Sequence, residues 1–229
     1  MIELIQLSTN NNDNSIIIRN IESEDIPDIV ELQKQSFPLM AKDGLIWDEY
    51  HLESHIRIFP EGQFCAELGG KIIASSSSLV TSLTPDYREH TWKEATAYGM
   101  FTNHTLKGDS LYGADISTHP DSRGLGIATL LYDARKDLAV KLNLRRIIAG
   151  GRLFNYCEYA KEMSAQEYAE KVVKGELKDP VLSFQLNNGF RFIKVLPNYM
   201  KDSRSLNYAS FIEWINPKYV SQKNELIPK

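Results

Sequence analysis

The sequence has little of what marks a secreted, membrane-embedded or nucleic-acid-binding protein. Its 229 residues include only two cysteines, Cys65 and Cys157, which form neither a metal-binding motif nor a disulfide framework. No stretch approaches the roughly 20 apolar residues of a membrane helix, and residues 1–15 lack the basic region and apolar run of a signal peptide. The net charge is −4 and the pI about 5.8. A cytoplasmic protein that binds no metal, membrane or nucleic acid is therefore expected.

The composition is that of a globular protein with a real core. Hydrophobic residues make up 42% of the chain and charged residues 24%. The polar run Thr9 to Asn14 predicts that residues 1–14 form a flexible N-terminal tail. No repeat or linker divides the rest of the chain, so residues 15–215 are expected to form one domain and residues 216–229 a C-terminal tail.

The stretch from Leu111 to Leu131 carries the most specific chemical pattern in the chain. It predicts a strand to Thr118, a turn over residues 119–122, and a helix that opens at residues 123–128 and continues to about residue 142. Gly124 and Gly126 carry no Cβ, so their backbone N–H groups can approach a ligand closely. Together with the positive end of a helix and the guanidinium of Arg123, this arrangement suits phosphate oxygens. It is neither a P-loop nor the dinucleotide-binding fingerprint GxGxxG.

The rest of the chain predicts alternating strands and helices. Ser23 is the expected N-cap of a helix to about residue 35, Gly69-Gly70 the turn of a hairpin, and Gly150-Gly151 the end of a strand that begins at Arg145. The region 83–108 has no clean period and is expected to be an insert on the substrate side. The other expected elements are strands at 15–19, 63–68, 71–80, 190–196 and 208–215, and helices at 47–58, 164–174 and 181–187.

The run Arg123-x-x-Gly126-x-Ala128 after a strand resembles the acetyl-CoA motif of the GNAT superfamily of N-acyltransferases, Arg/Gln-x-x-Gly-x-Gly/Ala. The order of elements over about residues 15 to 215 is also similar. The resemblance implies an α/β (α+β) fold with a mixed, mostly antiparallel central sheet flanked by helices. It implies that backbone groups of Ile116 and Thr118 bind the pantetheine arm of acetyl-CoA. The pyrophosphate would then be held by Arg123, Gly124, Leu125, Gly126, Ile127 and Ala128. Residues 150–152 and 183–190 are similar to the acetyltransferase domain that some bacteria join to a nitrilase-like hydrolase.

The proton-transfer groups are less well defined by the sequence. Many GNAT proteins carry a tyrosine that protonates the departing thiolate, but the matching position here is Gln185. Either a tyrosine of the 156–168 region, with Tyr156 as the candidate, takes this role, or the thiolate leaves into solvent. Asp115 is the nearest carboxylate for the general base, or it simply pairs with a neighbouring group. The alternatives for the base are His104, His119, Glu94 and a water relay.

These observations predict an N-acetyltransferase that moves an acetyl group from acetyl-CoA to the primary amine of a small molecule or peptide. Aromatic side chains of the 83–108 insert, together with the segment 152–178, are expected to wall the acceptor pocket. A catalytically silent CoA-binding sensor or partner protein is the first alternative, and a module that binds nucleotide or phosphate at the same turn is the second. The sequence leaves open the acceptor, the acyl length and whether the protein is a homodimer.

Overall fold

A computed structural model describes residues 5–7 and 15–221. Its strands form one sheet in the order β1-β2-β3-β4-β5-β6-β8-β7. Every neighbouring pair is antiparallel except β5 and β6, which are parallel. The expected mixed, mostly antiparallel sheet is therefore confirmed. The strands are β1 Ile5–Leu7, β2 Ile16–Asn20, β3 Gln63–Leu68, β4 Lys71–Thr81, β5 Ser110–Thr118, β6 Arg146–Arg152, β7 Arg191–Leu196 and β8 Ala209–Ile215.

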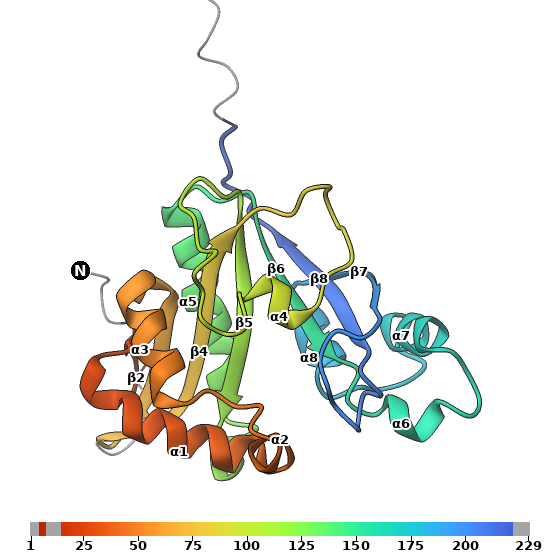
Figure 1. Ribbon diagram of the computed structural model, residues 1–229, viewed down its shortest axis with the longest axis horizontal. Helices are drawn as coiled ribbons and strands as arrows, with labels where there is room; N and C mark the ends of the chain where they lie inside the picture. Colours follow the sequence, from red (N-terminus) through yellow and green to blue (C-terminus); the bar gives the residue numbers. More distant parts are fainter. Residues whose placement is uncertain (1–4, 8–14, 222–229) are drawn as a thin grey trace, which may run out of the picture.

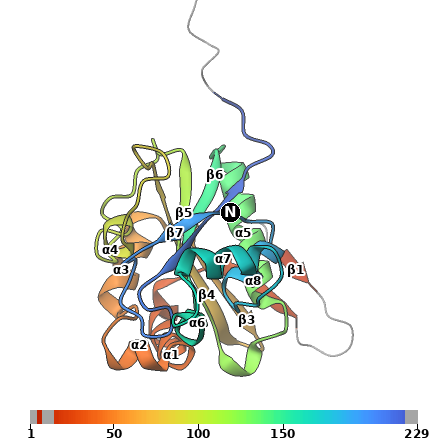
Figure 2. The same cartoon turned by 90° about the vertical axis from the view of Figure 1, so that its right-hand side faces the viewer.

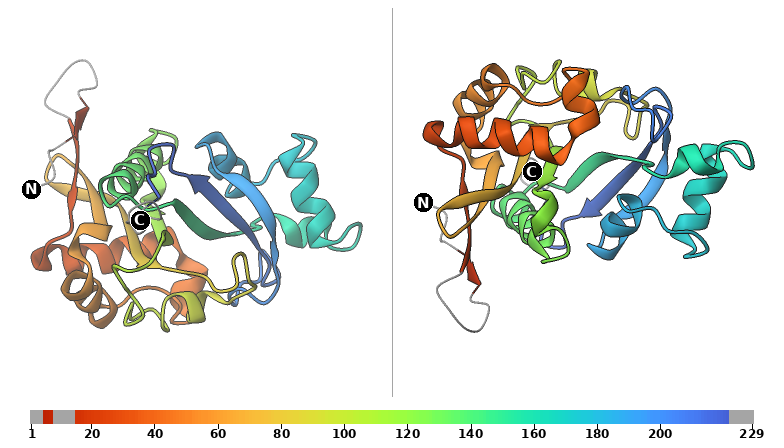
Figure 3. Two further views of the ribbon diagram at one scale, coloured as in Figure 1. Left: turned by 90° about the horizontal axis from the view of Figure 1, so that it is seen from above. Right: turned by 90° about the horizontal axis from the view of Figure 1, so that it is seen from below.

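Helices cover both faces of this sheet (Figure 3), and a hydrophobic core lies on each side. One face packs against α5, α7 and α8, whereas α1, α3 and α4 cover the other face with the loop around Phe101. Figure 2 shows α7 and α8 beside β7, at one end of the sheet. The helices are α1 Ile26–Ser36, α2 Pro38–Lys42, α3 Glu49–Ile58, α4 Trp92–Ala95, α5 Ile127–Lys141, α6 Tyr156–Tyr159, α7 Ala165–Val173 and α8 Leu182–Asn187.

Strands β5 and β6 separate along their length (Figure 1). Their ladder covers only residues 110–113 of β5 and 146–149 of β6. Beyond Gly113, β5 continues beside β4 to Thr118, while β6 continues beside β8 to Arg152. The sheet is thus one layer that opens into a V between its two halves. Backbone groups on the inner edges of this V are not used by the β5–β6 ladder.

Two local predictions are wrong: the end of a strand at Gly150-Gly151 and the helix N-cap at Ser23. Strand β6 runs through Gly150-Gly151 instead of ending there. A Cβ at Gly150 would lie 2.2 Å from the Tyr199 ring, and one at Gly151 would lie 2.3 Å from the Gln185 amide. The glycines therefore serve close packing on both faces of the strand, not a turn. Ser23 begins a short 3-10 turn, and Asp25 is the N-cap of α1.

The expected tails are shorter than the sequence indicated. Residues 5–7 form β1, which pairs with β2, while the rest of 1–14 lies outside the described residues. At the other end, Asn216 is buried and donates a hydrogen bond to the Leu144 carbonyl over 2.7 Å. The Val220 N–H donates to Asn143 Oδ1 over 2.9 Å. Residues 216–220 are therefore tied to the turn between α5 and β6.

The insert at 83–108 is a loop with one short helix, α4. Several of its side chains are part of the core, because Phe101 and Thr96 are fully buried and His90 is 4% exposed. Phe101 stacks on His55 of α3 with ring centroids 3.7 Å apart. The insert is thus an integral wall of the domain.

Candidate functional site

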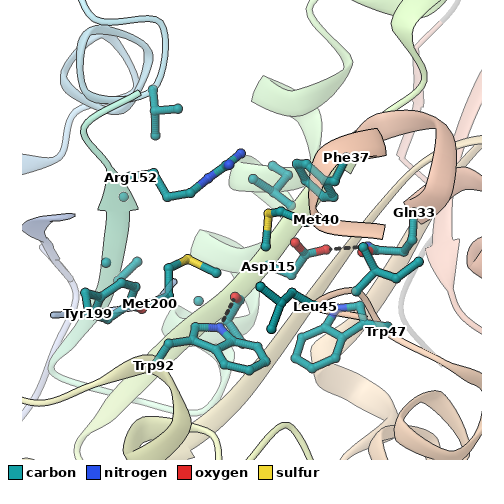
Figure 4. A pocket seen from close by; sticks show the side chains of 18 of the residues that line it. Gln33, Phe37, Met40, Leu45, Trp47, Trp92, Asp115, Arg152, Tyr199 and Met200 are labelled. Atoms are coloured by element: carbon teal, nitrogen blue, oxygen red, sulfur yellow. Dashed lines mark hydrogen bonds between the residues drawn. The ribbon is translucent and has the colours of Figure 1, made fainter. Parts of the chain in front are cut away.

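A cavity lies in the V between β5 and β6 (Figure 4). The inner edges of both strands form its floor, and the end of α1, the loop before α3, α4 and residues 199–200 close one side. On the other side it reaches α5 and α8 through Tyr132, Arg135 and Gln185. The cavity therefore connects the two faces of the sheet at the point where the strands part.

Strand alternation decides which side chains face α1 across this cavity. On β6, Gly151 faces Gln185 of α8, and Gly150 faces Tyr199 on the opposite side. Arg152 then points to the same side as Gly150, where its guanidinium carbon lies 5.5 Å from the Phe37 ring centre. On β5, a bulge opposite Ser77 and Ser78 shifts the register. Asp115 consequently faces α1 as well, so the two charged side chains share one face.

Asp115 is held by the amide of Gln33 on α1, whose Nε2 donates to Asp115 Oδ2 over 2.7 Å. Burial raises the pKa of the Asp115 carboxyl, while the Gln33 hydrogen bond and the charges of Arg135 and Arg152 act in the opposite direction. A carboxylate with a raised pKa at the wall of a cavity is suited to accept a proton.

Arg135 on α5 fixes the bulge that orients Asp115. Its Nε donates to the Ser78 hydroxyl over 2.9 Å, and its Nη2 donates to the Ser77 carbonyl over 2.8 Å and to the Asp115 carbonyl. The side chain approaches the strand closely at Gly113, where a Cβ would lie 3.2 Å from Nη1. The buried guanidinium therefore ties β4 and β5 together beneath the Asp115 side chain.

Two tryptophans wall the cavity near Asp115. The Trp92 indole N–H donates to the Ala114 carbonyl over 3.0 Å. Within the described part of the chain, the buried Trp47 Nε1 has no hydrogen-bond partner. The Trp47 N–H is near enough to Asp115 to lower the pKa of that carboxyl, but the two groups do not reach hydrogen-bonding geometry. An orphaned donor beside an acid in a cavity is expected where a ligand or water binds.

The turn after β5 leaves its backbone open. Gly124 and Gly126 have φ values of +82° and +77°, and a Cβ at either position would meet nothing within 4 Å. Among residues 5–7 and 15–221, no carbonyl accepts a backbone hydrogen bond from the N–H groups of residues 124–128. The start of α5 thus presents free donors and a positive helix end. The Arg123 side chain does not extend over this turn, because its Nη2 donates to the Ser36 carbonyl over 3.1 Å.

The structure does not bring Tyr156 to the cavity. Its ring packs beside Tyr168 and Tyr208, and its hydroxyl donates to the Met163 carbonyl over 3.2 Å. The tyrosines that line the cavity are Tyr132 and Tyr199. Tyr199 shares a hydrogen bond of 2.7 Å with the Tyr112 hydroxyl, and burial raises the pKa of both phenols.

The alternative bases named from the sequence have structural roles of their own. His104 accepts from the Val80 N–H over 3.1 Å, and His119 accepts from the Asp121 N–H over 3.2 Å. Glu94 closes a capping box with Thr91 at the start of α4. Asp115 is thus the carboxylate that the fold places in the cavity. No group of three possible metal-ligating side chains occurs in the described ranges.

The family model for the acetyltransferase (GNAT) family matches residues 26–156, which include the V, Asp115 and the open turn. The chain belongs to the GNAT acetyltransferase family. It is 42% identical over 205 residues to YkwB, an uncharacterized N-acetyltransferase of Bacillus subtilis (strain 168), covering 90% of this chain and 91% of that protein. This GNAT protein is therefore an enzyme that transfers acyl groups from coenzyme A.

Another relative is longer. The chain is 47% identical over 211 residues to the probable hydrolase YhcX of the same organism, but this match covers 92% of the chain and 40% of YhcX. Among solved structures, the loading GNATL domain of CurA from Lyngbya majuscula has a TM-score of 0.76 at 21% identity, covering 88% of this chain and 98% of that domain. That likeness supports the fold. No helix in the described ranges is long and apolar enough to cross a membrane.

Arg152, Arg135 and Trp47 were not identified from the sequence as parts of the site. Arg152 was missed because Gly150-Gly151 was interpreted as the end of the strand. The signal was present, because a strand that continues through Gly150-Gly151 places Arg152 on the same face as Gly150. Arg135 and Trp47 carried no local signal, because each contacts the site through tertiary packing alone.

Proposed function

We propose that this GNAT protein is an N-acetyltransferase that moves an acetyl group directly from acetyl-CoA to a primary amine. The observation that carries the proposal is the V between β5 and β6, where Asp115 lines the cavity and β5 runs on from it into the open backbone turn before α5. The open turn suits a phosphate-bearing acyl donor, and the carboxylate suits a nucleophile that must lose a proton.

The acyl donor would bind with its pyrophosphate against the N–H groups of Gly124 to Ala128 at the start of α5. Its pantetheine arm would then pass along the edge of β5 that β6 leaves free, beside Ile116 and Thr118. Arg123 would help indirectly, because its contact with Ser36 holds the turn against α1.

The transfer would need one proton acceptor near the amine. The amine nitrogen attacks the thioester carbonyl carbon, an amide bond forms, the C–S bond breaks, and the electron pair leaves on the thiolate. Asp115 would take the proton from the amine, held in place by Gln33 and by the bulge that Arg135 fixes. A thiol has a pKa of about 8.5, so the thiolate can leave without a dedicated acid.

The decisive experiment combines the protein with acetyl-CoA and a panel of amines, polyamines and amino acids. Release of free thiol measures turnover, and mass spectrometry must show the acetyl group on the acceptor nitrogen. We expect thiol release that depends on both protein and amine. Calorimetric binding of CoA without any amine-dependent thiol release would instead indicate a silent sensor. Competition by ATP or inorganic phosphate as strong as that by CoA would favour the phosphate-binding module.

A further inference from the structure

Arg152 is a cation with free donors at the wall of the cavity. Its side chain is 17% exposed and is sandwiched between Phe37 and Phe154, each 5.5 Å from the guanidinium carbon. Its Nη1 donates to Asp202 Oδ1 over 3.1 Å. Within the described residues, its Nε and Nη2 donate to no protein atom. The planar fork is therefore held in place while part of its hydrogen-bonding capacity faces the cavity.

Asp115 lies on the same α1 face, on the opposite arm of the V, close enough that the charge of Arg152 lowers the pKa of its carboxyl. Figure 4 shows Arg152 reaching from β6 toward Phe37, with Asp115 on the facing strand beside Gln33. A cavity with a carboxylate on one wall and a guanidinium on the other is complementary to a ligand that carries an amine beside a carboxylate. An amine without a carboxylate could pair with Asp115 but not with Arg152.

A second, mostly apolar hollow, here called the vestibule, shares a wall with the cavity. The inner cavity holds about 160 Å³ and the vestibule about 530 Å³, and both are lined by Leu45, Ile46, Trp92, Tyr199 and Met200. The vestibule is also lined by the exposed Tyr98 and by Lys93 and Lys201. A ligand that extended from the cavity past these shared side chains into the vestibule would have to carry an apolar group there.

We propose that the acceptor is an α-amino acid with a large apolar side chain. Its carboxylate pairs with Arg152, its amino group faces Asp115, and its side chain extends between Leu45, Trp92 and Met200 into the vestibule. The inference rests on the proposed function and names the substrate class of the same site.

The test compares acceptors that differ in one group, with free thiol and acetylated product as readouts. L-Phenylalanine and phenethylamine differ only in the carboxylate, whereas L-phenylalanine and glycine differ only in the side chain. We expect kcat/KM for L-phenylalanine to exceed that for each of the other two acceptors by roughly tenfold or more. Phenethylamine cannot form the charge-assisted pair with Arg152, and glycine has no aromatic ring to bury. L-Tryptophan, L-leucine and L-methionine should group with L-phenylalanine.

The role of Arg152 is tested by Arg152→Gln, with Arg204→Gln as the matched control. Arg204 also packs on the Phe154 ring, at 4.8 Å, but it pairs with Asn155 and Glu158 and does not line the cavity. Arg152→Gln should lower the ratio of kcat/KM for L-phenylalanine over phenethylamine to about one, a loss of roughly tenfold or more. Arg204→Gln should leave that ratio unchanged. Circular dichroism checks that both variants fold.

A binding measurement keeps the proposal open to refutation if Arg152→Gln does not fold. L-Phenylalanine added to the CoA-bound parent protein should change the fluorescence of the tryptophans in the cavity wall, and phenethylamine should do so only at concentrations roughly tenfold higher or more.

Equal use of the two acceptors by the parent protein would overturn the inference, as would an unchanged ratio in folded Arg152→Gln. Acetylation of polyamines but of no amino acid would refute the inference and leave the N-acetyltransferase function standing. Absence of turnover with every amine would refute both.

Discussion

Gly151 on β6 lies directly against the side-chain amide of Gln185 on α8. A Cβ on Gly151 would come within 2.3 Å of Gln185 Oε1, a distance that van der Waals repulsion forbids. The Ser210 hydroxyl donates to the Gly151 carbonyl over 3.1 Å and lies 3.4 Å from the same Gln185 oxygen. The missing side chain therefore lets α8 close onto the strand at the wall of the cavity.

Gly151→Ala should destabilise the protein by about 1–3 kcal/mol, because the new methyl group must displace Gln185 or push α8 outward. Urea denaturation followed by circular dichroism measures this loss. The double variant Gly151→Ala/Gln185→Ala is the control, since it removes the group that the methyl would strike and should recover most of the stability. A single variant as stable as the parent protein would show that α8 does not pack this closely.

Gln185→Leu should leave kcat within a few-fold of the parent value when acetyl-CoA and amine are saturating. The amide has no titratable proton at the position where many GNAT proteins carry a tyrosine, and Leu fills nearly the same volume. Steady-state kinetics with free-thiol detection tests this. A loss of a hundredfold or more in a variant that still binds CoA would mean that the amide itself assists the transfer.

Gly126→Glu should weaken CoA binding by roughly tens-fold or more, because a side chain and a negative charge would enter the space proposed for the pyrophosphate. Gly175→Glu is the matched control. Gly175 also has φ +77° and open space around its Cα, but it follows α7, away from the cavity. The two variants carry the same backbone strain and charge, so only the phosphate site distinguishes them. Equal CoA affinities by calorimetry would refute the pyrophosphate assignment.

Asp115→Asn should lower kcat/KM while leaving CoA affinity near the parent value, since the amide keeps the shape but cannot accept the proton. In the parent protein, the general base must be ionised. Because burial raises the pKa of Asp115, kcat/KM should fall as the pH decreases through that raised pKa. The pH profile of the variant should lack this acidic limb, and an unchanged limb would assign it to another group.

The sequence predicted those parts of the fold in which local pattern and tertiary environment agree. Gly69-Gly70 forms the turn between β3 and β4, with φ values of +58° and +77°. The helix expected at 164–174 is α7, and Ser164 and Glu167 form a capping box at its start. The turn after β5 and the helix that follows it were predicted for the same reason, because their pattern lies in consecutive residues.

The parts that the sequence did not predict depend on contacts between distant segments. Gly150 and Gly151 resemble a strand end locally, and only Tyr199 and Gln185 explain them as close-packed strand positions. The orientation of Asp115 depends on a bulge that Arg135 fixes from another element. Tyr156 was selected for its chemical type, but the packing of its ring directs its hydroxyl to the Met163 carbonyl.

His55 on α3 makes the stability of the domain depend on pH. Its ring is 1% exposed, stacks on Phe101, and has Nε2 2.6 Å from the Gly99 carbonyl oxygen. Burial lowers the pKa of His55 from 6.5 to about 4, and the charge of His51 acts in the same direction. Between these two pH values the unfolded chain binds a proton that the folded protein does not. The free energy of unfolding should therefore rise with pH in this window.

The free energy of unfolding is unaffected by His55 above pH 6.5. As the pH falls toward 4, protonation of His55 in the unfolded chain lowers it by about 3 kcal/mol. Urea denaturation at several pH values should show this slope for the parent protein. Carboxylates with lowered pKa values, such as Asp25 and Asp48, add a slope of the same sign at lower pH. The comparison with His55→Phe isolates the histidine, because the variant keeps the stacked ring and the carboxylates but cannot bind the proton. Parallel curves for the two proteins between pH 5 and 7 would show that His55 is protonated without penalty in the folded state.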